Sequence, residues 1–494
     1  MSRLTRSVLH LARFVLEART ALSIGSGGAD GVYDHPIVRD ANGLPTIPGT
    51  SLAGVLRHLW ANDHKNDPSS ANRLFGYQER DRGEASRLEV AACALHDSQD
   101  RPVEGLLLPS ADRDRLQGDW LLSTAVKTRE DPLFRDRVRL NHRGVAVKTG
   151  KFDRGLLAAG HRFSGELRLW SETRDDPNWR VLLGLLRDPR LRLGGTTRAG
   201  MGAMTLVKLH TGCFDLRDPA DIAAFQQLVP SLGATAGLTD CDPASLPVSG
   251  AATCTLEIEL IPRDFWRIGQ GNESLGRSGK TPDLLPKLEP IVTWTQGRAA
   301  AGTRYALVPG SSVKGALAHR MAFHWNTLNG KFVDDPAVDI KTWDKSEHCP
   351  GVREIFGFTK DRDTAPGRSR NASGQVGHVL IDDAHIEITE QDRRQRVQAM
   401  IHNSIDRFTG GVRNRMLFTE ELLYQFPIPL RITLLPGIDR ADATARRALA
   451  RAIRDLCEGR LALGAGVTKG HGSFTGTPDA KARDWLKTQG EDWT

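Results

Sequence analysis

The sequence predicts an α+β chain of two tandem domains within its 494 residues. Strand patterns alternate with helix patterns along each half of the chain. Five short motifs also occur twice in the same order, and only their spacing changes, as loop insertions in a duplicated domain would produce. The motifs of the first half are Ile24-Gly25-x-Gly27, Pro48-Gly49-Thr50-Ser51, Phe75-Gly76, Phe152-Asp153-Arg154 and Gly194-Gly195-Thr-Thr-Arg-Ala-Gly200-x-Gly202. Those of the second half are Ile268-Gly269-x-Gly271, Pro309-Gly310-Ser311-Ser312, Phe356-Gly357, Ile405-Asp406-Arg407 and Gly464-x-Gly466-Val-Thr-Lys-Gly470-x-Gly472.

Strand patterns come first in each half. Residues 13–19 alternate apolar and polar side chains, which is typical of a strand with one buried face, and residues 255–260 repeat the pattern. A second strand is expected over 162–169, with its counterpart over 425–432. The Gly and Pro residues in both suggest strands at the edge or end of a sheet.

Helix patterns follow over 178–186 and 443–457, where Leu, Ile and Val recur at helical spacing. Each leads into a Leu-x-Leu-Gly strand and a glycine-rich loop. This order of elements suggests domains built like ferredoxin or RNA-recognition-motif folds.

The domain boundaries follow from the repeated motifs. We expect a first domain over residues 1–209 and a second over 251–494, because about 200 to 250 residues suit one core. Residues 210–250 are rich in Asp, Pro, Ala and Gly and lie outside the motifs. We interpret them as a linker with one short helix around 220–228.

Composition narrows the class of protein. Hydrophobic residues make up 39% of the chain and charged residues 26%, and no apolar run approaches the roughly 18 residues that span a bilayer. No signal-peptide pattern opens the chain. The six cysteines include no Cys-x-x-Cys pair, so we expect reduced, mostly buried thiols. We expect a cytoplasmic protein with no membrane partner.

The net charge of +7 favours polyanionic partners without demanding them. Many soluble proteins with this charge bind nothing acidic. The 15 histidines show no zinc-ligand spacing. The placement of the basic residues is therefore more informative than their number.

The Pro-Gly-Thr/Ser-Ser motif precedes an apolar helical pattern in both halves. Free amides and the positive end of the helix dipole can bind a phosphate there, although a well-capped helix is the simpler reading of one copy. Because basic residues follow one or two turns later in both copies, we favour phosphate contact. The candidate phosphate-binding residues are Gly49, Thr50, Ser51, Arg57 and His58 in the first copy, and Gly310, Ser311, Ser312, Lys314 and His319 in the second.

The glycine-rich loops each carry one cation, Arg198 in the first copy and Lys469 in the second. Glycine lets the backbone approach a ligand closely, so the loop could line a groove for a sugar-phosphate chain. In most proteins a single loop of this kind is a tight turn. The spacing matches neither a Walker A loop nor a dinucleotide-binding fingerprint.

Taken together, these residues resemble the RAMP superfamily of CRISPR effector subunits, and within it the backbone subunits of type III complexes. The resemblance is carried by the stretch from Asp34 to Leu52, Leu74-Phe75-Gly76 and the glycine loops, and in the second copy by 308–315, 355–357 and 403–410. Two such domains in one chain are similar to the fused backbone subunits of type III-D-like effectors.

The resemblance implies partners and a modified RNA-recognition-motif core. The expected partners are a guide CRISPR RNA, a target single-stranded RNA and other type III effector subunits. Each domain would hold a short run of guide nucleotides and insert a β-hairpin thumb. Candidate thumb regions are 113–143 and 360–370, for which solvated charged loops are the alternative.

The resemblance also implies a catalytic residue and a metal. In type III backbone subunits a loop aspartate is needed for metal-dependent cleavage of target RNA, and Asp34 matches it by its place in the motif. The metal would be Mg²⁺ or another divalent cation, bound only with RNA through phosphate oxygens and Asp34. RNA supplies its own 2′-hydroxyl nucleophile, so one carboxylate can suffice. An Asp near Gly and Pro is otherwise most often a turn former.

The second copy departs from this pattern. If Pro290-Ile291-Val292 aligns with Pro36-Ile37-Val38, Leu288 occupies the position of Asp34. Glu289 and Asp283 are the candidate substitutes.

The Asp153-Arg154 and Asp406-Arg407 motifs also have two readings. They either shape the thumb and RNA groove, as in the family, or close surface loops with an ion pair of little consequence for stability.

Three hypotheses remain open. The first is an RNA-guided endoribonuclease subunit that cuts target RNA with Asp34. The second is an RNA-binding scaffold that does not cut. The third is a metal-independent guide-processing endonuclease, for which His35 is the only suggestive histidine.

Overall fold

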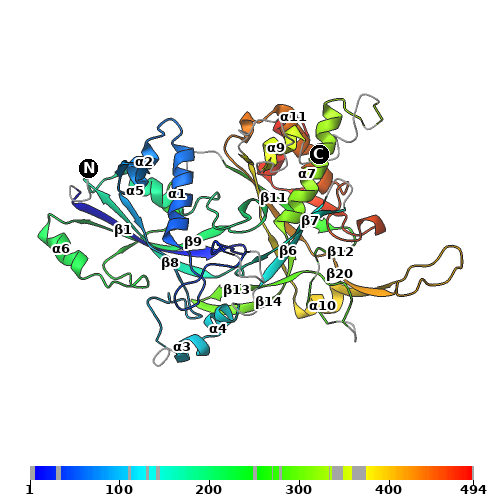
Figure 1. Ribbon diagram of the computed structural model, residues 1–494, viewed down its shortest axis with the longest axis horizontal. Coiled ribbons are helices and arrows are strands. Elements are labelled where there is room, and N and C mark those ends of the chain that lie inside the picture. The colour runs from blue at the N-terminus through cyan, green and yellow to red at the C-terminus, as the bar shows by residue number, and fades with distance from the viewer. Residues whose placement is uncertain are drawn as a thin grey trace.

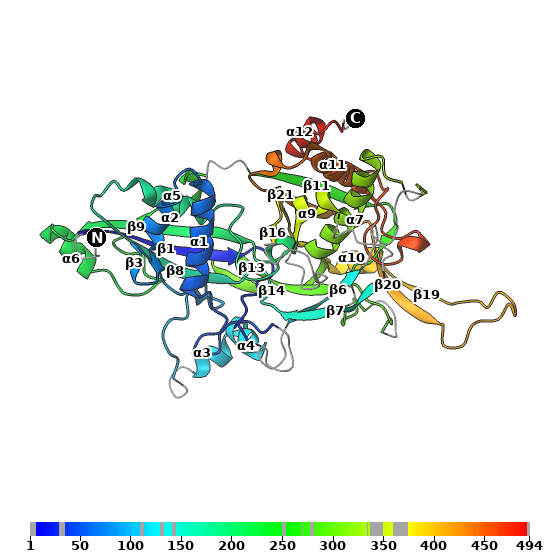
Figure 2. The same cartoon turned by 45° about the horizontal axis from the view of Figure 1, so that its top comes forward.

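The computed structural model describes residues 6–28, 35–108, 113–128, 133–140, 145–248, 253–269, 271–276, 281–332, 334–335, 349–358 and 374–491. Two α+β domains lie side by side along the longest axis, with the N-terminal half on one side and the C-terminal half on the other (Figures 1 and 2). The longest segments between core strands form hairpins that reach beyond their own domain.

The first domain is built on an antiparallel sheet in the order β10-β9-β1-β8-β4, with β5 also paired to β8. Its helices lie between the strands in sequence. The strands are β1 (Val8–Ala18), β4 (Leu88–Val90), β5 (Ala94–Leu95), β8 (Arg162–Ser171), β9 (Met204–Asp215) and β10 (Thr239–Asp240), and the helices are α1 (Gly49–Asp63), α2 (Ser70–Phe75), α3 (Arg113–Gly118), α4 (Trp120–Lys127), α5 (Pro177–Leu185) and α6 (Pro219–Gln226).

The second domain has an antiparallel sheet in the order β17-β21-β11-β22. Its strands are β11 (Cys254–Pro262), β17 (Val379–Ile381), β21 (Ile428–Leu434) and β22 (Phe474–Pro478), and its helices are α7 (Gly310–Leu328), α9 (Pro350–Phe356), α10 (Glu390–Arg396), α11 (Ala443–Cys457) and α12 (Ala480–Thr488).

The two sheets share one topology. In each, the four core strands lie in the spatial order fourth, first, third, second, since β9-β1-β8-β4 corresponds to β22-β11-β21-β17. One long helix connects the first strand to the second (α1 or α7), and another connects the third to the fourth (α5 or α11). This arrangement confirms the predicted pair of ferredoxin-like domains.

Helix packing explains why the apolar patterns predicted the helices correctly. Leu449, Ile453 and Leu456 of α11 are fully buried in the second core, and Leu52 and Leu56 of α1 are fully buried in the first. Each apolar stripe covers one face of its sheet, so periodicity and burial agree. The predicted helices over 178–186 and 443–457 are confirmed as α5 and α11.

The strands lie where they were predicted, but the burial of β1 and the sheet positions of β8 and β21 differ from the prediction. Strand β11 alternates buried and exposed residues as expected, whereas β1 is buried along nearly its whole length. Strands β8 and β21 are central and not edge strands. In β8 the glycine serves packing, because a Cβ on Gly165 would come within 2.4 Å of the Phe14 ring.

The second face of β1 is covered by residues that we expected to form a linker. Strand β9 continues to Asp215, β10 extends the sheet beside it, and Leu246 packs in the first core. The Arg13 guanidinium on β1 donates to the Ala234 carbonyl at 2.6 Å. Residues 210–248 therefore pack on the first domain, because their few apolar side chains and backbone groups find partners on its sheet.

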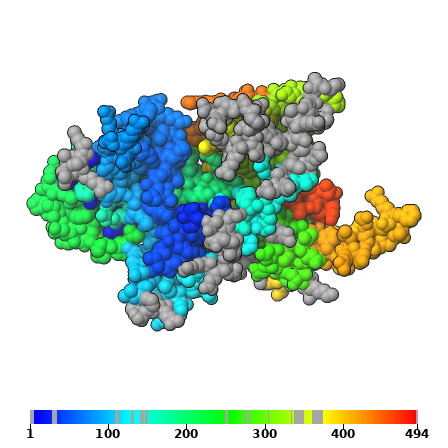
Figure 3. Space-filling model, in the orientation of Figure 1, coloured from blue at the N-terminus to red at the C-terminus, as the bar shows by residue number. Residues whose placement is uncertain are grey.

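Three hairpins extend from the cores. They are β6 (Phe134–Leu140) with β7 (Ala146–Gly155), β13 (Leu288–Thr295) with β14 (Arg298–Val308), and β19 (Val397–His402) with β20 (Phe418–Tyr424). The first crosses to the second domain, and the second returns to the first, where the Val292 amide donates to the Ala159 carbonyl at 2.9 Å. The third projects away from the body (Figure 3).

Shorter strands complete the described elements. They are β2 (Tyr77–Glu79) paired with β3 (Arg82–Glu84), β12 (Phe265–Trp266) paired with β20, β15 (Gly357–Phe358) paired with β16 (Gln375–Val376), and β18 (Ala384–Glu387) paired with β14.

The predicted thumb regions have different outcomes. Residues 360–370 lie outside the described residues. The described parts of 113–143 form α3, α4 and strand β6 of the crossing hairpin. In the second copy the corresponding long hairpin is β19–β20, which the sequence did not indicate.

The Asp153-Arg154 and Asp406-Arg407 motifs are not equivalent in space. The first pair ends strand β7, whereas the second lies between β19 and β20 at the hairpin tip. Similar residue pairs had suggested a match that the strand pairing does not support.

Two predictions from composition can also be compared with the described chain. All six cysteines are free, but Cys93 and Cys457 alone are buried and the other four are half-buried. Among the described helices, none combines the length and the apolar character needed to cross a bilayer.

Candidate nucleic-acid interface

The first glycine loop lies against the second domain. It contains a short 3-10 turn, Thr197–Ala199, followed by Gly200, whose φ of 120° favours glycine. A Cβ on Gly200 would fall 1.8 Å from a carboxylate oxygen of Asp383. The Asp383 amide donates to the Gly200 carbonyl at 3.2 Å, and the Arg198 guanidinium donates to the Gly377 carbonyl at 2.7 Å. The loop is thus part of the contact between domains.

Four cations gather around this loop. Arg137 donates to the Thr196 hydroxyl at 3.1 Å, and a Cβ on Gly195 would lie 2.5 Å from the Arg154 guanidinium. Lys314 enters from α7 of the second domain, and its ammonium donates to the Phe356 carbonyl at 3.4 Å. We call Arg137, Arg154, Arg198 and Lys314 the interdomain cation cluster.

The Asp383 carboxylate attracts Arg137, but it is hydrogen-bonded to Arg135. Within the described chain no ion pair forms to any of the four cluster members, and the Nε of Arg154 is buried without a hydrogen-bond acceptor. Burial lowers the pKa of Arg154 and Arg198, and lowers that of Arg137 to about 10. Burial, followed by repulsion from Arg198 and Arg137, lowers the pKa of Lys314 to about 8. An anion here would relieve both the repulsion and the lost hydration.

The crossing hairpin fixes the cluster through a buried ion network. Arg135 lies on β6, and its guanidinium donates to both oxygens of Glu289 and to Asp383, each at 2.5 Å. Burial disfavours the charge of Arg135, but the two carboxylates outweigh it and raise the pKa. Asp383 also accepts a hydrogen bond from the Gly310 amide at 2.8 Å. One arginine of the first domain thereby joins a strand and a helix start of the second.

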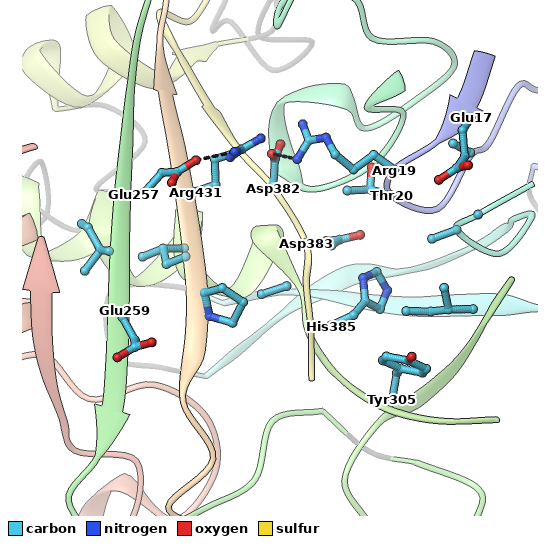
Figure 4. A pocket seen from close by; sticks show the side chains of 18 of the residues that line it. Glu17, Arg19, Thr20, Glu257, Glu259, Tyr305, Asp382, Asp383, His385 and Arg431 are labelled. Carbon is cyan, nitrogen blue, oxygen red and sulfur yellow. Dashed lines mark hydrogen bonds and ion pairs between the residues drawn. The ribbon is translucent and has the colours of Figure 1, made fainter. Parts of the chain in front are cut away.

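A second ion network lies beside it. Asp382 accepts a hydrogen bond from Arg19 at 2.7 Å and another from Arg192, and both arginines belong to the first domain. Burial alone would raise the pKa of Asp382, yet Arg192 and Arg19 together lower it. Figure 4 shows Arg19 and Asp382 in contact with one another, and both residues line a cavity of about 1070 Å³ between the domains.

This cavity does not suit a phosphate chain. Its floor is the open face of the second sheet, where Glu257 and Glu259 point outward from β11. Glu257 pairs with Arg431 (Figure 4). Glu17 on the other wall pairs with Arg162. Carboxylates therefore alternate with cations around it. The interdomain cation cluster is the better candidate for a polyanion.

In the first copy, the predicted phosphate residues are only partly brought to the cluster. Gly49, Thr50 and Ser51 begin α1, whose first turn holds no acidic residue. The Arg57 guanidinium donates to the Gly76 carbonyl and to the Asn72 side chain at 2.5 Å each. These hydrogen bonds within the first domain engage the side chain that we predicted to bind phosphate. Partial burial, Arg198 and Arg190 lower the pKa of His58, which places that imidazole near the cluster.

In the second copy, the helix start is already partly occupied. The Gly310 amide is bound to Asp383, and Ser311 and Ser312 follow it in the first turn of α7. The structure therefore does not support a free phosphate site at Gly310. An internal carboxylate takes the place that we predicted for an external phosphate.

The remaining basic candidates of the second copy separate. Lys314 joins the cluster, and His319 lies one turn further along α7. Lys469 lies on the exposed second glycine loop, with its ammonium 5.2 Å from the centre of the Phe418 ring. Lys469 is not part of the interdomain site.

The catalytic predictions require one correction. Glu289 is 1% exposed, and both of its oxygens are bound to Arg135. Burial would raise the pKa of Glu289, but Arg135 and then His385 lower it. The structure does not support its predicted role as a catalytic carboxylate, because it faces an arginine and not solvent.

Asp283 lies elsewhere. It is exposed near the base of the β19–β20 hairpin, where its carboxylate accepts a hydrogen bond from the Thr419 amide at 2.8 Å. Its own amide donates to the Thr419 carbonyl at 2.8 Å. Asp283 therefore does not meet Glu289 in one site.

Asp34 lies outside the described residues. The described chain resumes at His35, whose carbonyl accepts a hydrogen bond from the Gly155 amide at 3.1 Å. Because Gly155 directly follows Arg154, the segment after the predicted catalytic aspartate borders the cation cluster. In the described chain, no group of three His, Cys, Asp or Glu side chains could hold a metal ion.

Sequence reasoning missed Arg137 as a member of the site and left Arg154 undecided. Arg154 had been singled out with Asp153, but nothing in the sequence indicated that β6 and β7 cross to the second domain. The basic residues of β6 carried a weak signal, because they stand within a predicted thumb region.

The fold and the site define a duplicated ferredoxin-like protein with a buried basic cluster between its repeats. A family model for the RAMP superfamily matches residues 15–205 and 264–475, one region in each of the two domains. The chain therefore belongs to the RAMP superfamily, as the sequence motifs indicated.

One curated relative is the "CRISPR system Cms endoribonuclease Csm3" of Enterococcus italicus, 35% identical over 89 residues. That match covers 15% of this chain and 42% of the relative, so it spans less than half of the relative's length. A chain of the "Type III-B Cmr-beta Cryo-EM structure of the Apo state" aligns with a TM-score of 0.29 at 15% identity, over 40% of this chain and 96% of that chain.

Proposed function

We propose that this chain is an RNA-binding backbone subunit of a type III CRISPR effector complex and that its interdomain cation cluster holds a phosphate of the guide RNA. The observation that carries the proposal is the gathering of Arg137, Arg154, Arg198 and Lys314 with no ion pair to a carboxylate in the described chain. The RAMP superfamily match and the partial similarity to a CRISPR endoribonuclease are the reasons for proposing RNA as the polyanion.

Bringing four partly buried cations together is unfavourable in the absence of an anion. Repulsion among these cations disfavours the RNA-free protein, and a phosphate removes that cost while giving charge-assisted hydrogen bonds. Since Arg198 and Lys314 come from different domains, a phosphate held between them would also strengthen the contact between repeats. Backbone groups of RNA, and not base edges, would be recognised.

The test is binding of a labelled guide RNA by the wild type and by Arg154→Ala, Arg198→Ala and Lys314→Ala. Each variant should weaken binding by roughly 10-fold and reduce the salt dependence by about one phosphate contact. The matched control is Lys481→Ala on the exposed start of α12, which should bind as the wild type does. If all three cluster variants match this control, the phosphate proposal is wrong.

We further propose that the subunit cleaves target RNA and that Asp34 is the required carboxylate. The support is the motif around Asp34 and the description of the partial relative as an endoribonuclease. His35 and Gly155 also bring the start of the neighbouring segment beside the cation cluster. A carboxylate near a bound backbone could help align the 2′-hydroxyl or accept its proton.

The described residues do not offer a metal site of their own. A divalent cation bound only with RNA, such as Mg²⁺, would take most of its ligands from phosphate oxygens and water and would supply charge stabilisation at the phosphate. We derive no step through it.

Cleavage is tested with the complex assembled on a matching guide. Asp34→Ala should abolish at least one cut in a labelled target RNA while leaving guide binding unchanged. Asp484→Ala is the matched control, since no prediction assigns a role to that exposed carboxylate on α12. Unchanged cutting by Asp34→Ala would favour the second candidate, a scaffold subunit that holds RNA and does not cut.

A further inference from the structure

Equivalent backbone hydrogen bonds relate the two repeats residue by residue. The Gly195 amide donates to the Ser23 carbonyl at 2.7 Å, and the Ala465 amide donates to the Arg267 carbonyl at 2.8 Å. Each of these bonds joins a glycine loop to the segment that follows the first core strand. Arg267 is therefore the counterpart of Ser23, and the Ile-Gly motif that follows each of them gives the same alignment.

The same comparison aligns the second strand of each long hairpin. In both repeats the residue just before Ser23 or Arg267 pairs with this part of the chain, with Leu157 just after β7 and with Leu423 of β20. Three positions earlier stand Arg154 in the first repeat and Glu420 in the second. The second repeat thus has a carboxylate where the first has a member of the interdomain cation cluster.

A contact at the next residue agrees with this register. The Gly155 amide donates to the His35 carbonyl at 3.1 Å, and the Glu421 amide donates to the Leu284 carbonyl at 2.9 Å. By this register Asp283, which precedes Leu284, corresponds in sequence to the aspartate that precedes His35. The alignment of the two Pro-Ile-Val triplets is not supported by these contacts.

A second arginine of the cluster is also replaced. Arg137 lies opposite Phe152 in the first hairpin, and His402 lies opposite Phe418 in the second, two residues beyond the pairs that contain Arg154 and Glu420. The Arg137 guanidinium lies 5.8 Å from the centre of the Phe152 ring, and the His402 and Phe418 ring centres are 5.1 Å apart. His402 is therefore the counterpart of Arg137.

The Glu420 carboxylate is engaged entirely within the second repeat. One oxygen accepts hydrogen bonds from Nε and Nη2 of Arg267 at 3.3 Å each, and the other lies 2.8 Å from Nε2 of His402. The side chains of Glu420 and Arg267 are only 5% and 7% exposed. The buried arginine of the second repeat already has its anion, whereas in the described chain the arginines of the first cluster form no ion pair.

We propose that Glu420 closes the second copy of the phosphate site, so that guide RNA is held at the base of the β6–β7 hairpin and not at the base of β19–β20. The Glu420 carboxylate supplies internally the negative charge that a phosphate would supply in the first repeat, and it repels a phosphate that approaches Arg267. This assignment, which rests on the proposed RNA-binding function, makes Glu420 the determinant of which hairpin base holds the RNA backbone.

Neutralising this carboxylate should open the second site. Binding of a labelled guide RNA by the full chain is titrated at several salt concentrations for the wild type and Glu420→Gln, which keeps the side-chain size and releases Arg267. We expect the variant to bind about 5-fold more tightly at low salt, with a salt dependence steeper by about one phosphate contact. Unchanged circular dichroism would show that the variant folds.

Glu421→Gln is the matched control. The Glu421 carboxylate is also buried, but it accepts hydrogen bonds from the Leu275 amide at 2.8 Å and the Ser274 hydroxyl at 2.9 Å, and among the described residues no arginine pairs with it. Its neutralisation releases no cation and adds no phosphate contact. This variant should therefore bind RNA within about 2-fold of the wild type.

Hydrogen–deuterium exchange of the wild type tests the same point without a variant. Guide RNA should slow amide exchange around Arg154 and the first glycine loop, and it should leave exchange around Glu420 and the second glycine loop unchanged. Protection of both regions, or of neither, would overturn the proposal, as would a Glu420→Gln variant that binds as the wild type does. The proposed RNA-binding function fails separately, when Arg154→Ala, Arg198→Ala and Lys314→Ala all match their own control.

Discussion

The two glycine loops differ in what lies against them. The first packs on the second repeat, where Arg198 donates to the Gly377 carbonyl, and it forms one wall of the cation cluster. The second is exposed, and Lys469 contacts the Phe418 ring of the β19–β20 hairpin in its own repeat. Similar motifs therefore have different surroundings, because only the first has another repeat of the same chain beside it.

The two helix starts teach the same lesson. The Gly310 amide is bound to Asp383, whereas α1 begins beside an open pocket and the exposed Ala91 and Ala92. The second repeat thus supplies its own anion, whereas among the described residues no side chain caps the start of α1. A motif that reads as a phosphate site can be satisfied internally when the next strand ends in a carboxylate.

Among the variants that test this comparison, Arg135→Ala should have the largest effect on stability. Arg135→Ala leaves Glu289 and Asp383 buried without their cation, so we expect a loss of about 3–5 kcal/mol in the free energy of unfolding. Chemical denaturation measures it. The control Lys151→Ala, which removes a surface pair with Asp136, should cost at most about 1 kcal/mol. Equal losses in both variants would show that the interdomain network does not stabilise the joint.

Acid should weaken the same joint. The folded pKa of Glu289 and that of Asp382 are lowered, so their stabilisation is present above the unfolded pKa and is lost as pH falls through the folded pKa. For Glu289 this window runs from about 4.5 down to about 2. Thermal unfolding across that range should show a smaller decline in Glu289→Gln than in the wild type. An identical decline would exclude Glu289 as a source.

Variants of Arg198 and Lys469 should show that the two glycine loops differ in their contribution to RNA binding. We expect Arg198→Ala to weaken RNA binding by roughly 10-fold, since it would remove one of the proposed phosphate contacts. Lys469→Ala should weaken RNA binding by the isolated chain about 2-fold at most, because water screens the interaction between an exposed cation and a phosphate. A titration of both variants at one salt concentration makes the comparison. A larger effect at Lys469 would place the RNA on the second glycine loop.

The smallest expected effect is a pH dependence from Lys314. Burial and the neighbouring arginines lower its pKa to about 8, so the ammonium loses its proton as pH rises through that value. RNA affinity should then fall by a few-fold as the group becomes partly deprotonated, which is less than the roughly 10-fold loss expected for Lys314→Ala. Lys314→Arg keeps its charge and should abolish the fall. A fall of equal size in this variant would assign the pH dependence to another group.

Much of the fold could be predicted because it is local. The apolar stripes of α5 and α11 and the alternation of β11 depend on nearby residues, and the structure has these elements where they were expected. The burial of β1 on both faces could not be predicted, since it depends on residues 210–248 returning to the sheet.

The site was less predictable than the fold. Arg198 and Lys314 were identified from motifs, and they do lie in one cluster. Arg137 and the structural role of Glu289 were missed, because both depend on a hairpin that crosses between domains. Whether a carboxylate faces solvent or an arginine more than a hundred residues away leaves no mark on local sequence.

The sequence by itself determined the duplication, the α+β class and the superfamily, because repeated motifs and side-chain periodicity are properties of order along the chain. Only the tertiary structure decided which copy of each motif is covered, which carboxylates are paired and where the unpaired cations gather. Those outcomes depend on burial and charge between segments distant in sequence, and they exist only once the two repeats are packed together.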